Sequence, residues 1–457
     1  YPQWDTVFVP TLLRCEKTYF WGFLSSPLGR RLGIYSPDPI ASWHLDYNRF
    51  FADGGHRIMT FCLDFLQSGK LPDRHPQSQP LKPWETRRWR IEIAELAPEQ
   101  TVPSWLAEKG VPVFAGERWS AECRSPLEFE LLSRTEPTLM AEGRPVPCLL
   151  KKSGVYTVRL ESDQPRELRL TVSNGKHQSE AWVQFIHPWR TIMEEAARQS
   201  LSQPQKMGTH CESWYGLFTG AAAILHHLDF DCAAYLEKVR ELVSLGFDVE
   251  QGCPTVHPGR IQNTACMIGL MADLGAALHS TEPLELGAKL ADWLIEHSQR
   301  EDGAFCNGKG KHYTSVIYIA KSLLELVLEE RRQPEASWHA RAQRHFEAAK
   351  RAIDELALHR DNIETEGQAT LEDGMLTCSV AQLTMLAKML EPEERRPYIE
   401  AAECLVRKHR CLERSVVADS RCSGTTLRFW EAQYDVLTMG NMINSPHGWS
   451  AWKVYGM

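Results

Sequence analysis

The sequence lacks any CxxC pair, although it contains 13 cysteines in 457 residues. An odd number of cysteines without regular spacing matches neither a zinc site nor a disulfide framework. We therefore expect reduced and mostly buried thiols, no bound metal and no cofactor, in a reducing compartment.

Long apolar runs, a signal peptide and an excess of basic charge are also lacking. No uninterrupted apolar run reaches the ~18 residues that a membrane span needs, and no N-terminal stretch reads as a secretory signal. The net charge of -8 argues against nucleic acid, whose phosphates attract basic surfaces. We expect neither a membrane nor a nucleic-acid partner, and the sequence does not indicate an oligomeric state. Because the chain begins at Tyr1 rather than at methionine, we expect a preceding segment.

The first part of the chain has the pattern of a β protein. Short runs of alternating apolar and polar residues, such as 88–94, 127–131 and 168–172, are separated by proline and glycine. This spacing is typical of β-sandwiches. We predict a β-sandwich domain over residues 1–117 and a small immunoglobulin-like β module over residues 118–187.

From residue 188 onward the pattern becomes helical, and two kinds of helix alternate. One kind is apolar nearly all round and is rich in small residues, which predicts a buried helix; it covers residues 217–225, 261–279, 316–328 and 375–390. The other kind is amphipathic and predicts an outer layer; it covers residues 231–245, 284–299, 337–358 and 394–410.

Long loops rich in polar and aromatic residues precede the apolar helices. Loops above about 12–15 residues in a compact domain are usually functional or disordered. Two concentric rings of helices, with the long loops on one face, satisfy the pattern, so residues 188–457 are predicted to form an α/α toroid and to be the candidate catalytic domain. The last repeat stops at Met457 without a capping signal, so we expect an incomplete toroid.

A β region followed by an α/α toroid resembles the six-hairpin glycosidase superfamily, which includes glycoside hydrolases and polysaccharide lyases. The loops Thr370-Leu-Glu-Asp-Gly-Met375 and Asn444-Ser-Pro-His-Gly-Trp449 are similar to loops of bacterial sugar-degrading members. The resemblance implies a carbohydrate-active enzyme that binds an oligosaccharide or polysaccharide where the loops before the inner helices meet. A cytoplasmic location in a bacterium is expected rather than secretion. No subfamily is assigned.

Hydrolysis of a glycosidic bond needs two carboxyl groups, and the loops supply several. One group protonates the leaving oxygen, and the other attacks the anomeric carbon or activates water. Glu366 and Glu431 are the preferred candidates because they come from separate loops, and Asp373 is a third. An acid at the start of a helix can instead stabilise its first turn, and this alternative stays open for Asp373.

β-Elimination on a uronate needs different groups, which the same loops also supply. Histidine or tyrosine can remove and return the proton, and the candidates are His312, Tyr313, Tyr434 and His447. The residues predicted to bind the substrate are Glu212, Trp214, His257, Arg260, Asn263, Gln368, Arg428, Trp430, Asn444 and Trp449. The tryptophans are either sugar platforms or part of the core beneath the loops.

Cleavage of a glycosidic bond, by hydrolysis first, is therefore the function that the sequence favours. A polysaccharide lyase acting on a uronate-containing glycan is the first alternative. A non-catalytic carbohydrate-binding protein is the second, and it predicts sugar binding without product formation.

Overall fold

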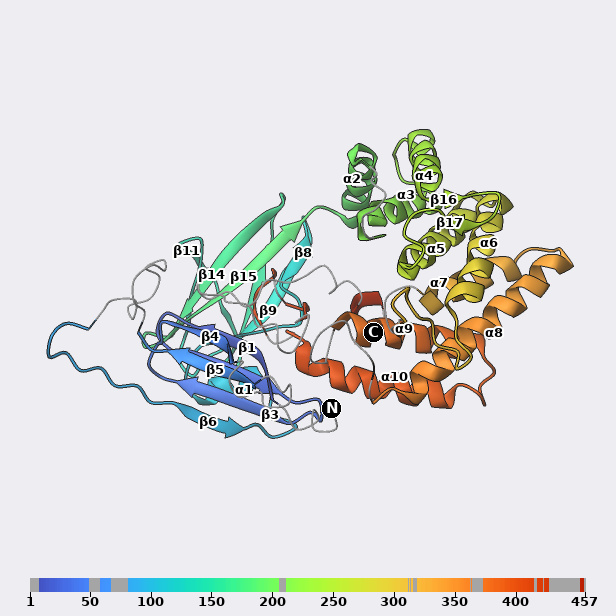
Figure 1. Cartoon of the computed structure of the whole chain (residues 1–457). Coiled ribbons are helices and arrows are strands. Elements are labelled where there is room, and N and C mark those ends of the chain that lie inside the picture. The colour runs from blue at the N-terminus through green and yellow to red at the C-terminus, as the bar shows by residue number, and fades with distance from the viewer. Residues whose placement is uncertain are drawn as a thin grey trace. The chain divides into compact units, whose positions relative to one another are not determined.

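The computed structural model describes residues 8–48, 58–66, 81–204, 211–310, 312, 314, 319–361, 363, 373–414, 417–421, 423–426 and 453–455. The chain divides into two compact units. The first contains Tyr1–His187, Gly367–Asp373 and Arg407–Ser450, and the second contains Pro188–Glu366, Gly374–Val406 and Ala451–Met457. The blue to green part of the chain in Figure 1 is mostly strands, and the green to orange part is mostly helices.

The first unit begins with an antiparallel sheet of order β1-β2-β3-β6. Its strands are β1 (Val9–Cys15), β2 (Phe20–Ser25), β3 (Arg31–Ser36) and β6 (Glu92–Glu95), and a separate hairpin pairs β4 (Ser42–Asn48) with β5 (Ile58–Asp64). Thr101 is the N-cap of helix α1 (Val102–Glu108), and its side chain accepts a hydrogen bond from the backbone N–H of Ser104. Every residue of β2 is buried, as expected for a strand covered on both faces. A sandwich over residues 1–117 stays a prediction.

Two further sheets enclose one core and form a sandwich. One has the order β11-β10-β14-β15-β8, and the other has the order β12-β13-β9-β7. The strands are β7 (Val113–Ala115), β8 (Ser120–Glu122), β9 (Leu127–Leu132), β10 (Thr138–Ala141), β11 (Arg144–Val146), β12 (Leu149–Lys152), β13 (Val155–Leu160), β14 (Arg166–Ser173) and β15 (Gln178–Ile186). Both sheets contribute to the core, for example through Phe129, Val158, Leu170 and Val183. Buried and partly exposed residues alternate along β15 because its side chains point alternately to the two faces.

The second unit is built of consecutive helical hairpins. Its elements are α2 (Trp189–Ser202), η4 (Cys211–Trp214), α3 (Tyr215–Leu225), α4 (Cys232–Gly246), β16 (Phe247–Asp248), β17 (Cys253–Pro254), α5 (Ile261–Leu278), α6 (Thr281–Ser298), α7 (Ile319–Arg331), α8 (Ala336–Leu358) and most of α9 (Asp373–Met389) and α10 (Arg396–His409). Asp373, the last residues of α10 and η5 (Arg410–Leu412) belong to the first unit. The apolar helices α3, α5 and α7 pack in series, and each pairs with the amphipathic helix that follows it. The predicted alternation of buried and amphipathic helices is confirmed for these elements.

Buried polar groups join helices within a hairpin and between hairpins. Tyr235 on α4 donates a hydrogen bond to the carbonyl of Leu217 on α3, at 2.7 Å. The side chain of Gln382 on α9 accepts from the backbone N–H of Ala320 at 3.1 Å and donates to the carbonyl of Thr314 at 2.9 Å. Gln382 thus stabilises the N-terminus of α7, where backbone N–H groups lack helical partners.

Helix α5 is long and apolar enough to cross a membrane by length and composition alone, although Gln262, Asn263 and Asp273 interrupt its apolar residues. However, 78% of this helix is buried inside the structure, as is typical of a core helix.

Candidate functional site

Two of the loops singled out in the sequence lie against each other in the second unit. They precede the inner helices α5 and α7. The backbone N–H of Gly308 donates a hydrogen bond to the carbonyl of Gly259 at 3.0 Å. A Cβ atom on Gly259 would lie 3.1 Å from the Cα of Gly308, so the approach requires residues without side chains.

His257 adopts a backbone conformation that is uncommon for residues other than glycine. Its φ of 51° lies in the left-handed region. Its carbonyl accepts a hydrogen bond from the backbone N–H of Arg260 at 2.8 Å, which closes a turn directly before α5. Strained residues of this kind cluster at functional sites, and the turn places His257 and Arg260 at the same helix end.

A pocket of about 410 Å³ lies where these two loops meet. Its lining residues are His257, Gly259, Arg260, Gln262, Asn307, Gly308 and Lys309. They supply two fixed cations, one imidazole and two amides, and no carboxylate. The N-terminus of α5 adds the positive end of its dipole. The combination suits an anionic ligand that also carries hydroxyl groups. The volume lies within the usual range for small-molecule sites.

A third predicted loop joins the same helix end. The side-chain oxygen of Asn263, in the first turn of α5, accepts a hydrogen bond from the backbone N–H of Cys211 at 3.1 Å. Asn263 is buried and therefore holds η4 against α5 rather than lining the pocket. Glu212 lies in η4, and its side chain is outside the described residues.

Trp214 is part of the core. Only 1% of its surface is exposed, and its ring packs edge-on against Phe247 at 6.2 Å between centroids. A sugar platform needs an accessible ring face, so this placement supports the core-packing alternative.

His312 and Asp373 are also engaged in structural contacts. Nδ1 of His312 lies 3.5 Å from a carboxylate oxygen of Glu355 on α8, which also lies 2.9 Å from Nδ1 of His359. His312 is not among the residues that line the pocket. Asp373 is fully buried at the start of α9 and lies 2.6 Å from Nε2 of His409. These contacts favour structural roles for both residues.

The remaining predicted site residues lie outside the described residues: Tyr313, Glu366, Gln368, Arg428, Trp430, Glu431, Tyr434, Asn444, His447 and Trp449. Gln262, Asn307 and Lys309 line the pocket but were not among the predicted binding residues. The signal was present, because all three lie in or directly after the loops that the sequence singled out.

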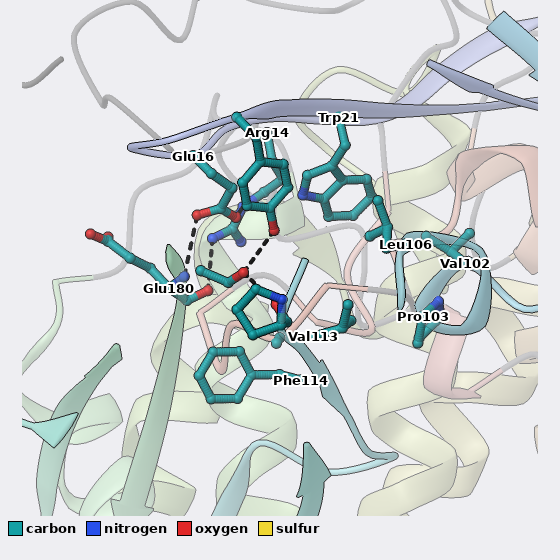
Figure 2. Close-up of a pocket in the computed structure, with 13 residues that line it drawn as sticks. Arg14, Glu16, Trp21, Val102, Pro103, Leu106, Val113, Phe114 and Glu180 are labelled. Atoms are coloured by element: carbon teal, nitrogen blue, oxygen red, sulfur yellow. Dashed lines mark hydrogen bonds and ion pairs between the residues drawn. The ribbon is translucent and has the colours of Figure 1, made fainter. Parts of the chain in front are cut away.

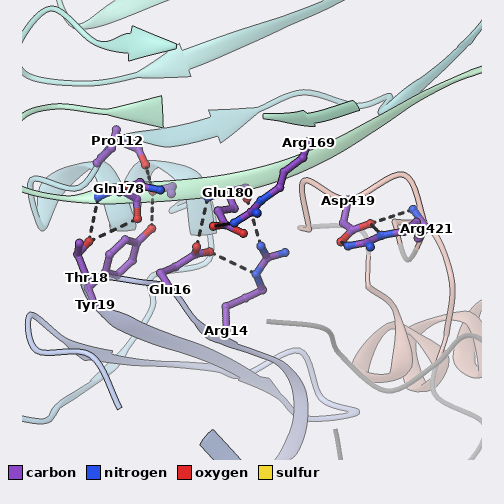
Figure 3. Close-up of polar contacts among 11 residues, drawn as sticks. Arg14, Glu16, Thr18, Tyr19, Pro112, Arg169, Gln178, Glu180, Asp419 and Arg421 are labelled. Carbon is purple, nitrogen blue, oxygen red and sulfur yellow. Dashed lines mark hydrogen bonds and ion pairs between the residues drawn. The ribbon is translucent and has the colours of Figure 1, made fainter. Parts of the chain in front are cut away.

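A second and much smaller cavity lies in the first unit (Figure 2). Its volume of about 30 Å³ has room for about one water molecule, so it is too small for a sugar. Beside it Arg14 and Glu16 form a buried ion pair at 3.3 Å (Figure 3). Arg14 also donates to the carbonyl of Glu180 at 3.1 Å, and Glu16 accepts from the backbone N–H of Glu180 at 3.2 Å. The cluster joins β1 to β15, and its role is structural.

The fold is similar to that of a solved polysaccharide lyase. The TM-score is 0.70 at 14% identity, over 99% of this chain and 68% of that chain. An unsaturated glucuronyl hydrolase from a Bacillus species gives a TM-score of 0.35 at 12% identity, over 60% of this chain and 86% of that one. A family 76 glycoside hydrolase from a bovine Bacteroides thetaiotaomicron strain gives 0.32 at 9% identity, over 64% and 76%.

No family model and no curated protein matches the sequence. At 14% identity the likeness to the lyase shows a shared fold. The resemblance to toroid-containing carbohydrate-active enzymes, stated from the sequence, is confirmed at the level of that fold.

Proposed function

We propose that the chain is an enzyme that cleaves glycosidic bonds in a uronate-containing oligosaccharide or polysaccharide by β-elimination. The single observation that carries the proposal is the pocket at the N-terminus of α5. Its described lining presents Arg260, Lys309 and His257 together with two amides, and no carboxylate. The fold shared with a polysaccharide lyase supports the same choice. Residues 188–457 are proposed to be the catalytic domain.

Elimination depends on neutralising the uronate carboxylate. The proton on the adjacent carbon becomes acidic only when the charge that develops on that carboxylate is stabilised. Arg260 and Lys309 can supply the positive charge, and the amides of Gln262 and Asn307 can bind the carboxylate or neighbouring hydroxyl groups. A base must then remove the proton, and histidine is the side chain most often used for that step. His257 is the imidazole in the lining, so we assign it this role. The imidazolium that forms can return the proton to the leaving oxygen as the carbon–oxygen bond breaks and the carbon–carbon double bond forms.

Hydrolysis stays a prediction that depends on Glu366 and Glu431, both outside the described residues. It requires two carboxyl groups on either side of the scissile bond. The described lining of the pocket supplies none. The cations and the imidazole of the described lining therefore support elimination.

A panel of neutral and uronate-containing oligosaccharides tests the proposal, with reducing ends and near-ultraviolet absorbance recorded in the same samples. Elimination produces a new reducing end together with a carbon–carbon double bond conjugated to the carboxylate, so both signals rise in parallel. Reducing ends without absorbance would replace elimination by hydrolysis. Saturable binding without either signal would make the chain a carbohydrate-binding protein.

A further inference from the structure

The chain before α7 folds back on itself into an arm with a buried base. Cys306 pairs with His312 in an antiparallel β-bridge. Phe305 has no exposed surface, and its backbone N–H donates a hydrogen bond to Oγ1 of Thr314 at 3.0 Å. The carbonyl of Thr314 accepts from the side chain of Gln382 at 2.9 Å. The base of the arm is therefore fixed to α9.

The tip of the arm is a turn that presents Lys309. The backbone N–H of Gly310 donates to the carbonyl of Asn307 at 2.8 Å. The side-chain oxygen of Asn307 accepts from the backbone N–H of Lys309 at 2.9 Å, which is a common way for asparagine to stabilise a turn. The backbone of Lys309 is therefore held at a defined place in the lining of the pocket.

This tip touches the turn before α5 through two glycines. The backbone N–H of Gly308 donates to the carbonyl of Gly259 at 3.0 Å. A Cβ atom on Gly259 would lie 3.1 Å from the Cα of Gly308, and a Cβ atom on Gly308 would lie 2.9 Å from the Cα of Gly259. Neither glycine has a φ in the left-handed region. Glycine is therefore required at both positions by the contact itself and not by the backbone conformation.

Each of the two glycines is followed directly by a cation of the pocket. Arg260 follows Gly259, and Lys309 follows Gly308. Because consecutive Cα atoms lie about 3.8 Å apart, the contact keeps the Cα atoms of Arg260 and Lys309 within roughly 12 Å of each other. Two long side chains can meet over such a distance, and a carboxylate accepts hydrogen bonds at both of its oxygens.

We propose that the contact between Gly259 and Gly308 is a positioning element, which makes Arg260 and Lys309 bind the same uronate carboxylate. The inference rests on the proposed function, since this carboxylate is the group that elimination must neutralise. It adds that the two cations act as one unit and that the pair of glycines sets their spacing. If the loops moved apart, each cation would contribute only its own hydrogen bond.

Equilibrium binding of the uronate-containing oligosaccharides, measured by calorimetry in the His257→Asn protein, tests the inference without turnover. Asparagine tolerates the left-handed backbone of this position and lacks the imidazole that removes the proton. In this background Arg260→Ala and Lys309→Ala should each weaken binding about tenfold. The double variant should also weaken it about tenfold rather than about 100-fold, because groups that act as one unit are not additive. A loss equal to the product of the single losses would overturn the inference.

Gly308→Ala tests the positioning role and leaves both cations in place. We expect about tenfold weaker binding, with little further loss when Lys309→Ala is added. Gly259→Ala introduces the clash from the other loop and should have the same effect. Gly310→Ala is the matched control: it adds a methyl group to the same tip, no atom lies within 4 Å of the new Cβ, and binding should stay close to that of the parent protein. Full affinity in both Gly308→Ala and Gly259→Ala, or an equal loss in Gly310→Ala, would contradict the positioning role.

The outcomes distinguish this inference from the proposed function. If the wild type forms no unsaturated product but the losses in binding are non-additive, the positioning role stands and the proposed elimination fails. If the wild type forms unsaturated products and the losses are additive, elimination stands and the positioning role fails. If no uronate-containing oligosaccharide binds, both fail.

Discussion

Removing one cation from the pocket should weaken elimination on a uronate-containing glycan. Arg260 and Lys309 line the same pocket of about 410 Å³, so each can approach a bound carboxylate. A hydrogen bond to a charged group contributes about 1.5–3 kcal/mol. Both side chains are exposed, so we use the lower end of that range. Since about 1.4 kcal/mol is a factor of ten, Arg260→Ala and Lys309→Ala should each lower kcat/KM about tenfold.

The assay measures kcat/KM for a uronate-containing oligosaccharide, at low and at high salt. Arg240→Ala is the matched control: this residue on α4 loses the same charge, but its side chain is 69% exposed and is not among those that line the pocket. The loss should shrink as salt rises, because exposed charges are screened beyond about 10 Å at 0.1 M ionic strength. No loss for Arg260→Ala and Lys309→Ala, or an equal loss for Arg240→Ala, would refute the assigned role of the pocket.

Three further predictions concern stability. The hydrogen bonds that raise the pKa of His345 above its ordinary value of 6.5 outweigh burial, which acts in the opposite direction. The contribution of His345 to the free energy of unfolding is therefore complete below pH 6.5 and is lost as pH rises through the pKa of His345 in the folded state. In urea unfolding at low pH, His345→Gln should lower the free energy of unfolding by about 3 kcal/mol. A difference from the wild type that grows as pH rises would contradict this prediction. Gly303→Ala should lower the melting temperature more than Gly310→Ala: both have positive φ, but only at Gly303 would a Cβ lie 2.6 Å from the backbone oxygen of Arg351. Arg14→Met should lower the free energy of unfolding by about 3–5 kcal/mol because Glu16 stays buried without the guanidinium that balances its charge. The double variant Arg14→Met with Glu16→Leu should recover most of this loss, and no recovery would argue against the ion pair.

The order of strands and helices could be predicted from the sequence, because each pattern is local. Small apolar residues all round 261–279 predicted a buried helix, and α5 is one. The proximity of the loops before α5 and α7 could also be predicted, because the inner helices of a toroid run side by side. Polar clusters such as that of Asp292, Glu330 and His345 could not be predicted from the sequence. Each of these residues belongs to the polar part of a different helix, and only tertiary packing brings them together.

Only part of the candidate site could be predicted, because local patterns do not reveal tertiary packing. His257 and Arg260 were identified because their loop sits directly before an apolar helix. Trp214 and Asp373 looked equally suitable, but the structure buries both. Whether a loop residue points outward or into the core depends on distant neighbours such as Phe247 and His409, which local spacing does not reveal.

The most direct test of the account is the mass of the products released from a uronate-containing oligosaccharide. Elimination breaks the glycosidic bond without adding water, so the new fragments together weigh as much as the substrate, and one fragment absorbs in the near-ultraviolet. We predict that result for the wild type and a strong decrease in product for Arg260→Ala. Fragments that together weigh one water molecule more than the substrate, without absorbance, would contradict the account.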